Sequence, residues 1–375
     1  MLILKILHTA DWHIGRRLNG ADLLCDQMHV LDQLIDYIKE EEIDLCVIAG
    51  DVFDRSNPSQ SALGLVNEYL YKINIELGVP VLAISGNHDS RSRLDYGSYW
   101  FEKSNYHMRT SIEDILKPVI IDDHHFYMVP YMDVLEAKQY FKDDTIVAHH
   151  DVYRKITEEI HGVMDREARN ILVGHMFMSN AKASESERPL SIGLSEEVGA
   201  DLFKDFEMVL LGHLHHPFAI EHDTIFYSGS LLKYSFSEVR QPKGFRVIET
   251  GDGNKCRFVP TKCKYDLVHY KGSYEEVINE AVRFEDNNAY FKFELTGLET
   301  VKDPMAKLKM IYPNTLELRP VVEAHEKYRS TVDINQSDDG EIFDAFIKQV
   351  HGAELTEYQS GLFNKLFKGD ADETD

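Results

Sequence analysis

The sequence predicts an α/β protein in which two sheets pack together, followed by a small α+β domain and C-terminal helices. Three observations lead to this prediction. Strand and helix patterns alternate between residues 3 and 84, strand patterns predominate between about 120 and 248, and the pattern changes again after residue 265. The chain of 375 residues is also longer than one hydrophobic core usually serves. We therefore expect one large domain accompanied by something smaller.

The alternating part contains three short apolar runs that we interpret as buried strands: residues 3–7, 45–49 and 81–84. Apolar residues recur at helical spacing between them. The first helical pattern covers residues 28–38, and the second begins at Pro58 and ends at Gly78. A strand–helix–strand–helix–strand order predicts a parallel sheet with right-handed crossovers.

The middle of the chain is predicted to be rich in strands. Six short runs of mainly apolar and β-branched residues indicate strands: 126–129, 145–148, 171–173, 209–211, 225–227 and 245–248. We expect these strands to form a second sheet that packs on the first. His124 and His125 precede the first of these runs, and we expect them at the surface in a turn.

The pattern changes after about Tyr265. Three strands are predicted to alternate with helical segments at 274–283 and 301–310, and these strands cover residues 266–270, 289–295 and 315–321. Alternation of apolar and charged residues between 291 and 295 predicts that one face of this small sheet is wet. Two short amphipathic helices follow from Glu341, separated at Gly352. The predicted parts are therefore residues 1–264, 265–334 and 341–375.

Composition fits an ordinary globular protein, because 43% of residues are apolar and 28% are charged. The opening apolar run is too short for a signal sequence or a membrane span. The four cysteines show neither zinc spacing nor a dense disulfide pattern, so we expect a cytoplasmic protein. The net charge of −24 opposes simple electrostatic capture of nucleic acid. Any nucleic-acid surface must therefore be local or be completed by a partner.

Five short motifs each follow a predicted strand: Asp11-Trp12-His13, Gly50-Asp51, Gly86-Asn87-His88-Asp89, Gly174-His175 and Gly212-His213-Leu214-His215. In open parallel sheets, binding sites gather at the carboxyl ends of the strands. Carboxylate, amide oxygen and imidazole ligands together suit a divalent ion such as Mn²⁺, Fe²⁺ or Zn²⁺. The glycines let the backbone turn sharply and approach the ions closely. The motifs therefore predict a dinuclear metal site.

Each motif has a simpler interpretation when it is taken alone. A Gly-Asp pair after a strand is usually a turn, and a Gly-His pair is less informative still. Gly-Asn-His-Asp could be a loop with Asn in a left-handed turn. The two histidines at 213 and 215 could lie on opposite faces of a strand. The dinuclear interpretation rests on the conjunction, because all five motifs occur in order and each follows a strand.

The five motifs resemble the signature of the calcineurin-like metallophosphoesterase superfamily, and no signature position is missing. The resemblance implies a four-layer α/β/β/α sandwich of two mixed sheets and two divalent ions. It also implies seven ligands: Asp11, His13 and His215 for the first ion, Asn87, His175 and His213 for the second, and Asp51 as the bridge between them. A bridging role suits Asp51 because one carboxylate can bind both ions.

The expected nucleophile is a water molecule or hydroxide between the ions, because metal coordination lowers the pKa of water towards neutrality. His88 is the imidazole that we expect to donate a proton to the leaving oxygen. We expect Asp89 to orient His88 by pairing with its ring. The alternative interpretation makes His88 an ordinary loop residue.

Flanking segments narrow the class of phosphoester, and five of them resemble SbcD-type nuclease subunits: residues 8–15, 49–58, 184–188, 227–230 and 234–238. The resemblance covers about residues 1–250 with specific motifs and the rest more weakly. It implies a Mn²⁺-dependent DNA nuclease that works with an SMC-like ATPase of the SbcC type, as an ATP-dependent double-strand exonuclease and a single-strand endonuclease. The small domain would be a capping domain. Archaeal and eukaryotic relatives commonly carry His where Asp54 stands here, which leaves the role of Asp54 open.

Residues other than the metal ligands are expected to contact DNA, a partner protein or a second copy of the chain. Four arginines follow metal motifs and are candidates for binding DNA phosphates, although each could equally be a solvated loop residue: Arg16, Arg17, Arg91 and Arg93. The apolar stripe of the C-terminal helices could pack on its own domain or dock on a partner. The resemblance favours docking on the base of the SbcC coiled coil, and it implies a homodimer surface within residues 59–105.

Two other classes of function compete with a DNA nuclease. A phosphomonoesterase or a phosphodiesterase for small molecules would use the same ligands, but such an enzyme needs neither the accessory domain nor the amphipathic tail. A catalytically silent scaffold typically loses ligands or the catalytic histidine, whereas every position is filled here.

Overall fold

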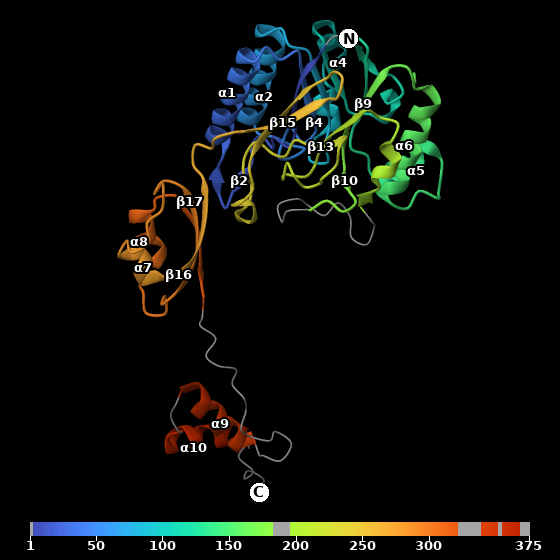
Figure 1. Ribbon diagram of the computed structural model, residues 1–375. Helices are drawn as coiled ribbons and strands as arrows, with labels where there is room; N and C mark the ends of the chain where they lie inside the picture. Colours follow the sequence, from blue (N-terminus) through green and yellow to red (C-terminus); the bar gives the residue numbers. More distant parts are fainter. Residues whose placement is uncertain (1–2, 183–195, 322–338, 352–354, 368–375) are drawn as a thin grey trace. The chain divides into compact units, whose positions relative to one another are not determined.

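The computed structural model describes residues 3–182, 196–321, 339–351 and 355–367 (Figure 1). The chain forms two compact units, Met1–Arg319 and Pro320–Asp375. The segment 184–188, which contributes to the resemblance above, lies outside the described residues, as do residues 322–334 of the expected capping domain. None of the described helices is long and apolar enough to cross a membrane.

The first sheet has six strands in the order β15-β14-β1-β4-β5-β6. Its four parallel strands are β1 (Lys5–Thr9), β4 (Leu45–Ala49), β5 (Val81–Ile84) and β6 (Tyr106–Arg109). Two antiparallel strands, β14 (Gly244–Glu249) and β15 (Lys255–Pro260), extend it beyond β1. Two helices cover its outer face: α1 (Leu24–Glu40) and α2 (Gln60–Tyr71), which continues as a π-helical turn, Lys72–Glu76.

The second sheet has five strands in the order β13-β12-β9-β8-β7. These strands are β7 (Val119–Ile121), β8 (His124–Val129), β9 (Arg169–His175), β12 (Met208–Gly212) and β13 (Ile225–Tyr227). All neighbours are parallel except β7 and β8. Its outer face is covered by α5 (Val134–Phe141) and α6 (His149–Val163).

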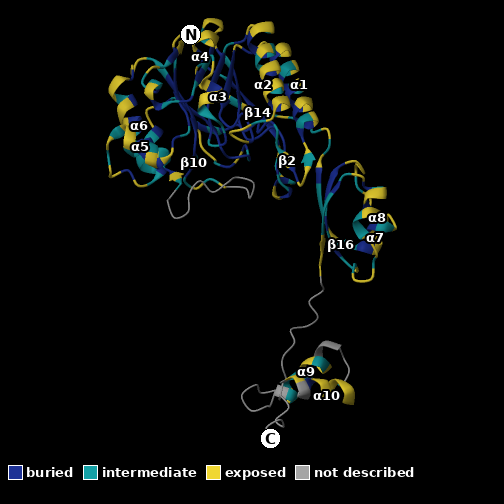
Figure 2. Cartoon of the chain, turned by 180° about the vertical axis from the view of Figure 1, so that it is seen from behind, coloured by how far each residue is buried: buried dark blue, intermediate teal, exposed yellow. Residues whose placement is uncertain are grey.

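Side-chain alternation along the strands explains why the two sheets stack. In β4, Cys46 and Ile48 belong to the core beneath α1 and α2, whereas Leu45 and Val47 belong to the core between the sheets. Successive residues of a strand point to opposite faces, so a continuous apolar run has both faces buried. Figure 2 shows the strands dark blue between helices with exposed outer faces. The expected four-layer sandwich of two mixed sheets is therefore confirmed.

Three expectations about the middle of the chain are wrong. Residues 145–148 form no strand, because the Asp151 carboxylate accepts the amide protons of Val147 and Ala148 and so fixes the start of α6. Residues 245–248 do form a strand, but β14 pairs with β1 in the first sheet rather than joining the second. His124 is fully buried in β8 and does not lie in a surface turn.

The remaining elements of this part are short: β2 (Arg17–Leu18), β3 (Ala21–Asp22), α3 (Arg91–Asp95), α4 (Ser98–Phe101), β10 (Phe177–Met178), β11 (Glu197–Val198) and the 3-10 turns Glu102–Ser104, Ile112–Asp114, Ala200–Phe203 and Phe236–Glu238. The last of these, η5 (Phe236–Glu238), lies beside the metal centre described below.

The small domain contains β16 (Leu267–Ser273), α7 (Tyr274–Ile278), β17 (Tyr290–Thr296), α8 (Pro304–Ile311) and β18 (Thr315–Pro320). It has its own core, in which Phe291, Phe293 and Leu295 of β17 are fully buried. Hydrogen bonds join it to the larger part, among them one from Tyr290 Oη to Asp26 Oδ2 at 3.0 Å and one from Asn19 Nδ2 to Glu317 Oε2 at 2.9 Å.

The second unit contains α9 (Asp339–His351) and α10 (Glu357–Phe367). The rings of Phe343 and Phe363 stack with centroids 4.3 Å apart, and this contact joins the two helices. Phe346, Leu362 and Leu366 remain exposed by 57%, 48% and 71%. The expected apolar stripe is therefore only partly used within its own unit.

Candidate metal centre

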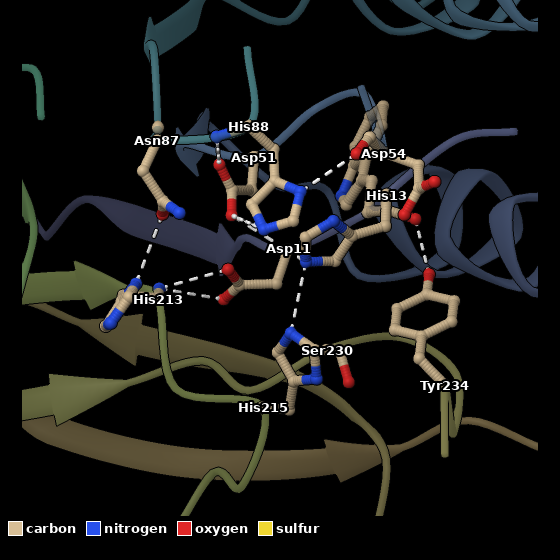
Figure 3. Close-up of polar contacts among 12 residues, drawn as sticks. Asp11, His13, Asp51, Asp54, Asn87, His88, His213, His215, Ser230 and Tyr234 are labelled. Atoms are coloured by element: carbon tan, nitrogen blue, oxygen red, sulfur yellow. Dashed lines mark hydrogen bonds and ion pairs between the residues drawn. The ribbon is translucent and has the colours of Figure 1, made fainter. Parts of the chain in front are cut away.

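The seven expected ligands come together at one edge of the sandwich. Figure 3 labels all of them except His175. Three groups follow β1, β4 and β5 of the first sheet, and two groups come from the ends of β9 and β12 in the second. Parallel strands end at the same edge, so the topology places loops from distant parts of the chain side by side. Six of the seven side chains are buried, and Asn87 is half-buried.

The first half of the centre contains Asp11, His13 and His215, whose ligand atoms lie within 4.8 Å of one another. Nε2 of His13 lies 3.0 Å from Nε2 of His215. The Asp11 carboxylate accepts the amide proton of His213 at 3.0 and 3.1 Å, which fixes its orientation. Two imidazole nitrogens and a carboxylate that converge in this way suit one divalent ion.

The second half contains Asn87, His175 and His213. Asn87 Oδ1 lies 2.9 Å from Nε2 of His175 and 3.2 Å from Nδ1 of His213. The other ring nitrogen of His175, Nδ1, lies 2.8 Å from the carbonyl oxygen of Ala49. Because a carbonyl only accepts, Nδ1 carries a proton, so in the neutral ring that a metal ion requires the lone pair is on Nε2, facing the cluster.

Asp51 lies between the two halves. Its Oδ2 is 3.7 Å from Nε2 of His13 and 3.5 Å from Nε2 of His175. Its Oδ1 accepts the amide proton of His88 at 2.8 Å. One oxygen is thus held by the backbone, and the other faces ligands of both halves, as a bridge between two ions requires.

Four ligands have backbone conformations that residues other than glycine rarely adopt. The φ angles are positive at Asp11 (52°), His13 (43°), Asp51 (51°) and His213 (99°). Such conformations cost free energy and persist only where the surroundings impose them, typically at functional sites. Here the amides of Asp11 and His13 each donate at 3.0 Å, to the carbonyl oxygens of Gly50 and Asp51. The loops are therefore held in the conformations that aim the ligands inward.

Two motif glycines are required by close approach. A Cβ atom at Gly86 would lie 2.1 Å from Oδ1 of Asp51, and one at Gly50 would lie 2.4 Å from Nδ1 of His175. Gly50 also has a φ of +91°, in the region that favours glycine. Any side chain at either position would displace a ligand.

The electrostatics of the cluster favour bound cations. Burial raises the pKa of Asp11 to about 6. Burial also disfavours charge on His175, but attraction to the Asp51 carboxylate raises the pKa of His175 to about 9. For Asp51, burial alone would raise the pKa, yet the facing histidines, His175 first, lower it. Buried carboxylates that need positive partners, surrounded by imidazoles, fit divalent metal ions well.

His88 lies at the same cluster. Its Nδ1 is 2.8 Å from the carbonyl oxygen of Asp54, and its Nε2 is 4.0 Å from Oδ2 of Asp51. Its ring meets the His13 ring edge to face, with centroids 4.7 Å apart. The proton on Nδ1 is therefore held by the backbone, and Nε2 faces the region between the ligands. By distance, His88 also groups with His13 and Asp51 as a possible third set of ligands.

The expected pairing of Asp89 with the His88 ring is wrong. The Asp89 carboxylate instead accepts amide protons from Gly86 at 2.9 Å, Phe53 at 2.9 Å and Val52 at 3.2 Å. These amides belong to the loops after β4 and β5, and they would be unpaired without the carboxylate. Asp89 therefore joins two ligand-bearing loops, and it is the carbonyl of Asp54 that orients His88.

Of the four arginines, Arg16 and Arg17 line the same cleft. Nη1 of Arg16 donates to Oδ1 of the buried Asp54 at 2.8 Å, and Nη2 of Arg17 donates to the carbonyl oxygen of Gly20 at 2.8 Å. Tyr234 lines this cleft as well. Asp54 thus connects the arginine side of the site with the carbonyl that holds His88.

The other two arginines point elsewhere. Arg91 donates to the carbonyl oxygen of Tyr131 at 2.7 Å and pairs with Glu136. Arg93 donates to Asn57 at 2.8 Å and lines an apolar groove beside α2. The structure therefore does not gather the four arginines into one cluster.

Sequence reasoning assigned no role to two residues beside the first half of the centre. The Tyr234 ring packs edge to face on His13 and His215, with centroids 5.3 and 5.7 Å away. Glu238 Oε1 lies 3.0 Å from Nδ1 of His215. The only signal in the sequence was the 234–238 segment itself, which lies outside every metal motif.

Comparison with known families agrees with this geometry. Residues 4–217 match the calcineurin-like phosphoesterase family, and residues 263–351 match the family described as type 5 capsule protein repressor C-terminal domain. The chain is 44% identical over 365 residues to SbcD, the D chain of the nuclease SbcCD, from Staphylococcus epidermidis. The alignment covers 97% of this chain and 98% of that protein.

Two solved structures show weaker similarity. TT1561 of Thermus thermophilus aligns with a TM-score of 0.38 and 12% identity, over 68% of this chain and 99% of that one. GAP50, the anchor in the inner membrane complex of Plasmodium, aligns with a TM-score of 0.39 and 13% identity, over 86% and 98%. Both scores are too low to assign a fold. The family matches and the 44% identity over nearly the whole length show that this chain belongs to the SbcD family of calcineurin-like phosphoesterases.

Proposed function

We propose that this chain is the Mn²⁺-dependent nuclease subunit of an SbcCD-type complex. It would hydrolyse DNA phosphodiester bonds in end processing, hairpin removal, repair and recombination, as an ATP-dependent double-strand exonuclease with an SbcC-type ATPase and as a single-strand endonuclease. One observation carries the proposal: a complete set of ligands for two ions converges, with His88 beside it, in a chain 44% identical to the SbcD chain of an SbcCD nuclease.

When bound, two divalent ions lower the pKa of a water molecule towards neutrality and offset charge on the phosphate. The chain supplies position and proton transfer. Because the Asp54 carbonyl keeps a proton on Nδ1 of His88, a second proton on Nε2 gives a ring that can donate it to the leaving oxygen. The mixture of carboxylate, amide and imidazole ligands suits Mn²⁺, Fe²⁺ or Zn²⁺, and the similarity to SbcD-type nucleases favours Mn²⁺ among them.

A basic cleft supports DNA as the substrate despite the net charge of −24. The cleft has a volume of about 960 Å³ and is lined by residues of the large part and of the small sheet. Six of its lining residues are cationic: Arg16, Arg17, Arg240, Lys271, Lys292 and Arg319. The cleft begins beside Tyr234, which touches two ligands of the first ion. A DNA backbone along this cleft would pass from the small capping domain to the ions.

The proposed homodimer would use the face made by α2, the π-helical turn after it, α3 and α4. This face exposes large apolar side chains, including Tyr71 (52%), Ile75 (49%), Tyr96 (77%) and Trp100 (74%). Tyr71, Ile75 and Tyr96 also line an apolar groove of about 260 Å³. Concentrated exposed apolar surface of this kind marks a protein interface, and a second copy of the chain offers the same face in return.

The proposed contact with the ATPase would use α9 and α10. Their exposed Phe346, Leu362 and Leu366 supply an apolar face that the Phe343–Phe363 stack leaves open. Helix pairs of this kind dock by placing apolar side chains into the groove of another helical element. We propose that these side chains dock into a groove at the base of the coiled coil of an SbcC-type ATPase.

The test compares three substrates. Purified protein with Mn²⁺ is offered circular single-stranded DNA, bis-nitrophenyl phosphate and a phosphomonoester. The proposal expects cleavage of the DNA and of the diester. Turnover of the monoester without DNA cleavage would assign the site to a phosphomonoesterase instead, and inactivity on all three despite bound metal would point to a scaffold.

A further inference from the structure

Glu238 is a fully buried carboxylate that belongs to no metal motif and is not itself an expected ligand. It lies in η5, and both of its oxygens are engaged. Oε1 is 3.0 Å from Nδ1 of His215. Oε2 is 2.6 Å from Nζ of Lys243 and accepts the amide proton of Tyr234 at 3.1 Å. A buried acid bonded directly to an expected ligand needs a functional or structural reason.

The bond to His215 has a definite consequence for the imidazole. An ionised carboxylate only accepts hydrogen bonds, so Nδ1 of His215 must carry a proton. In the neutral ring the lone pair is then on Nε2, the nitrogen that faces His13 across 3.0 Å in the first half of the centre. Among the four expected ligand histidines, all within the described part of the chain, the structure shows such a bond to a carboxylate outside the ligand set at His215 alone.

Lys243 pairs with the carboxylate and holds it in place. Besides Glu238, its Nζ lies 3.0 Å from the carbonyl oxygen of His215, from Oγ of Ser230 and from Oε1 of Gln241. The ammonium group is thus fixed to the same loop that carries His215. The charges of Glu238 and Lys243 offset each other, so the carboxylate orients the ring without adding net charge to the centre.

We infer that Glu238 is a positioning residue for the first metal ion: through its bond to Nδ1 it holds His215 in the tautomer and orientation that direct Nε2 to the ion. This inference rests on the proposed two-metal site. Carboxylate partners of this kind raise the basicity of a ligand imidazole, and their loss typically weakens metal affinity by about 10- to 100-fold. The alternative is a purely structural ion pair that anchors η5 to β14.

The first test titrates metal-free protein with Mn²⁺ and follows free Mn²⁺ by electron paramagnetic resonance. Wild-type protein should bind two ions, and failure to do so would overturn the two-metal site itself rather than this inference. In Glu238→Gln, one of the two binding constants should weaken by about 10- to 100-fold while the other is retained. The amide has the shape of the acid, but it offers both a donor and an acceptor, so it no longer selects one tautomer of His215. Unchanged constants would refute the role of Glu238.

Two further variants separate positioning from general damage. Glu207→Gln removes an acid that is hydrogen-bonded to Nε of Arg169 at 2.9 Å and touches no ligand, so both Mn²⁺ constants should stay at their wild-type values. The double variant Glu238→Gln/Lys243→Met removes both charges and thus avoids a stranded ammonium group. Weakening of the same site should persist in it. Recovery of wild-type affinity in the double variant would show that the unpaired Lys243 caused the loss, and the inference would fail.

A spectroscopic measurement reports on the bond itself. In Zn²⁺-loaded protein with nitrogen-labelled histidine, the Nδ1 proton of His215 should resonate far downfield because a carboxylate accepts it. The signal is assigned by its absence in His215→Ala. Glu238→Gln should move this resonance upfield, whereas Glu207→Gln should leave it in place. A resonance at the same position in wild type and Glu238→Gln would contradict the inference even if metal affinity changed.

Discussion

Single residues in the centre divide into those expected to hold ions and one, His88, proposed to transfer a proton. The ligand histidines face one another and Asp51, whereas His88 has one nitrogen bound to the Asp54 carbonyl and the other free to face a substrate. His88 sits only 4.0 Å from Oδ2 of Asp51, however, so geometry alone places it within reach of a metal as well. The two roles differ in what removal of the ring does to metal content.

His88→Ala should lower the rate of DNA cleavage by about 100- to 10,000-fold, because the leaving oxygen loses its proton donor. Two Mn²⁺ ions should remain bound, since none of the seven expected ligands is changed. Elemental analysis after gel filtration measures the metal content, and cleavage of circular single-stranded DNA measures the rate. His215→Ala is the matched control and should lose metal. Loss of an ion in His88→Ala would make His88 a ligand.

A second residue-scale prediction concerns stability in acid. Burial, with repulsion from Arg246 as a smaller cause, lowers the pKa of His8 from 6.5 to about 3. Between these values the unfolded chain binds a proton that the folded chain does not, so folding stability falls as the pH falls below 6.5. The slope is at most about 1.4 kcal/mol per pH unit for one proton.

His8→Leu should therefore remove this part of the acid sensitivity. Urea titrations of the metal-free wild type and variant give the free energy of unfolding at each pH. The difference between the two proteins should be constant above pH 6.5 and should shift in favour of the variant as the pH is lowered from 6.5 towards 3. A difference that stays constant across this range would show that His8 keeps its ordinary pKa.

Elements differ in how far the sequence alone predicts them. The runs at 45–49 and 81–84 are fully buried on both faces, so their apolar patterns reproduce the bounds of β4 and β5. The run at 145–148 has a similar apolar pattern, but it forms no strand because Asp151, just after it, caps the helix that follows. The pairing of β14 with β1 joins residues about 240 positions apart, and the local apolar pattern does not specify which strand will be the neighbour.

The same limit applies inside the site. The seven expected ligands could be proposed from the sequence because each lies in a short motif after a strand. The partners that orient them could not, because Asp89 binds amides of another loop, and Glu238 meets His215 across 23 residues of chain. Positive φ angles at Asp11, His13, Asp51 and His213 are likewise a product of the assembled loops rather than of residue type.

The next prediction tests the face made by α2, the π-helical turn after it, α3 and α4. Ile75→Glu places a charge in the proposed dimer interface, and two-fold symmetry would bring it close to its own copy. Dimerisation should weaken by roughly 100-fold or more. Light scattering after gel filtration measures the mass.

The control for this variant is Leu135→Glu, which changes an equally apolar side chain, 67% exposed, on α5. It should remain dimeric. Both variants should keep their Mn²⁺-dependent turnover of bis-nitrophenyl phosphate, because neither residue contacts a ligand. A wild-type monomer, or a dimer that survives Ile75→Glu, would remove this face as the interface.

For the whole molecule, the ions should act as a clamp between the two sheets. The expected ligands of each ion come from both sheets, so bound metal should favour the folded sandwich over the unfolded chain. At a hundredfold excess over its Kd, each ion should add about 2.7 kcal/mol to the free energy of unfolding. Chelation should therefore lower the Tm, and added Mn²⁺ should restore it. Asp51→Asn should show a much smaller rise, and a Tm indifferent to Mn²⁺ in wild type would contradict the site.

The distribution of the ligands along the chain has a consequence during synthesis. The first ligand is Asp11 and the last is His215, and His13 and His215 meet although 202 residues separate them. A nascent chain that has not yet emerged from the ribosome beyond residue 215 lacks part of both ion sites. Fragments that end before residue 213 would lack expected ligands of both ions and would therefore be inert towards DNA. DNA cleavage would therefore require a chain in which both sheets have been synthesised and packed together.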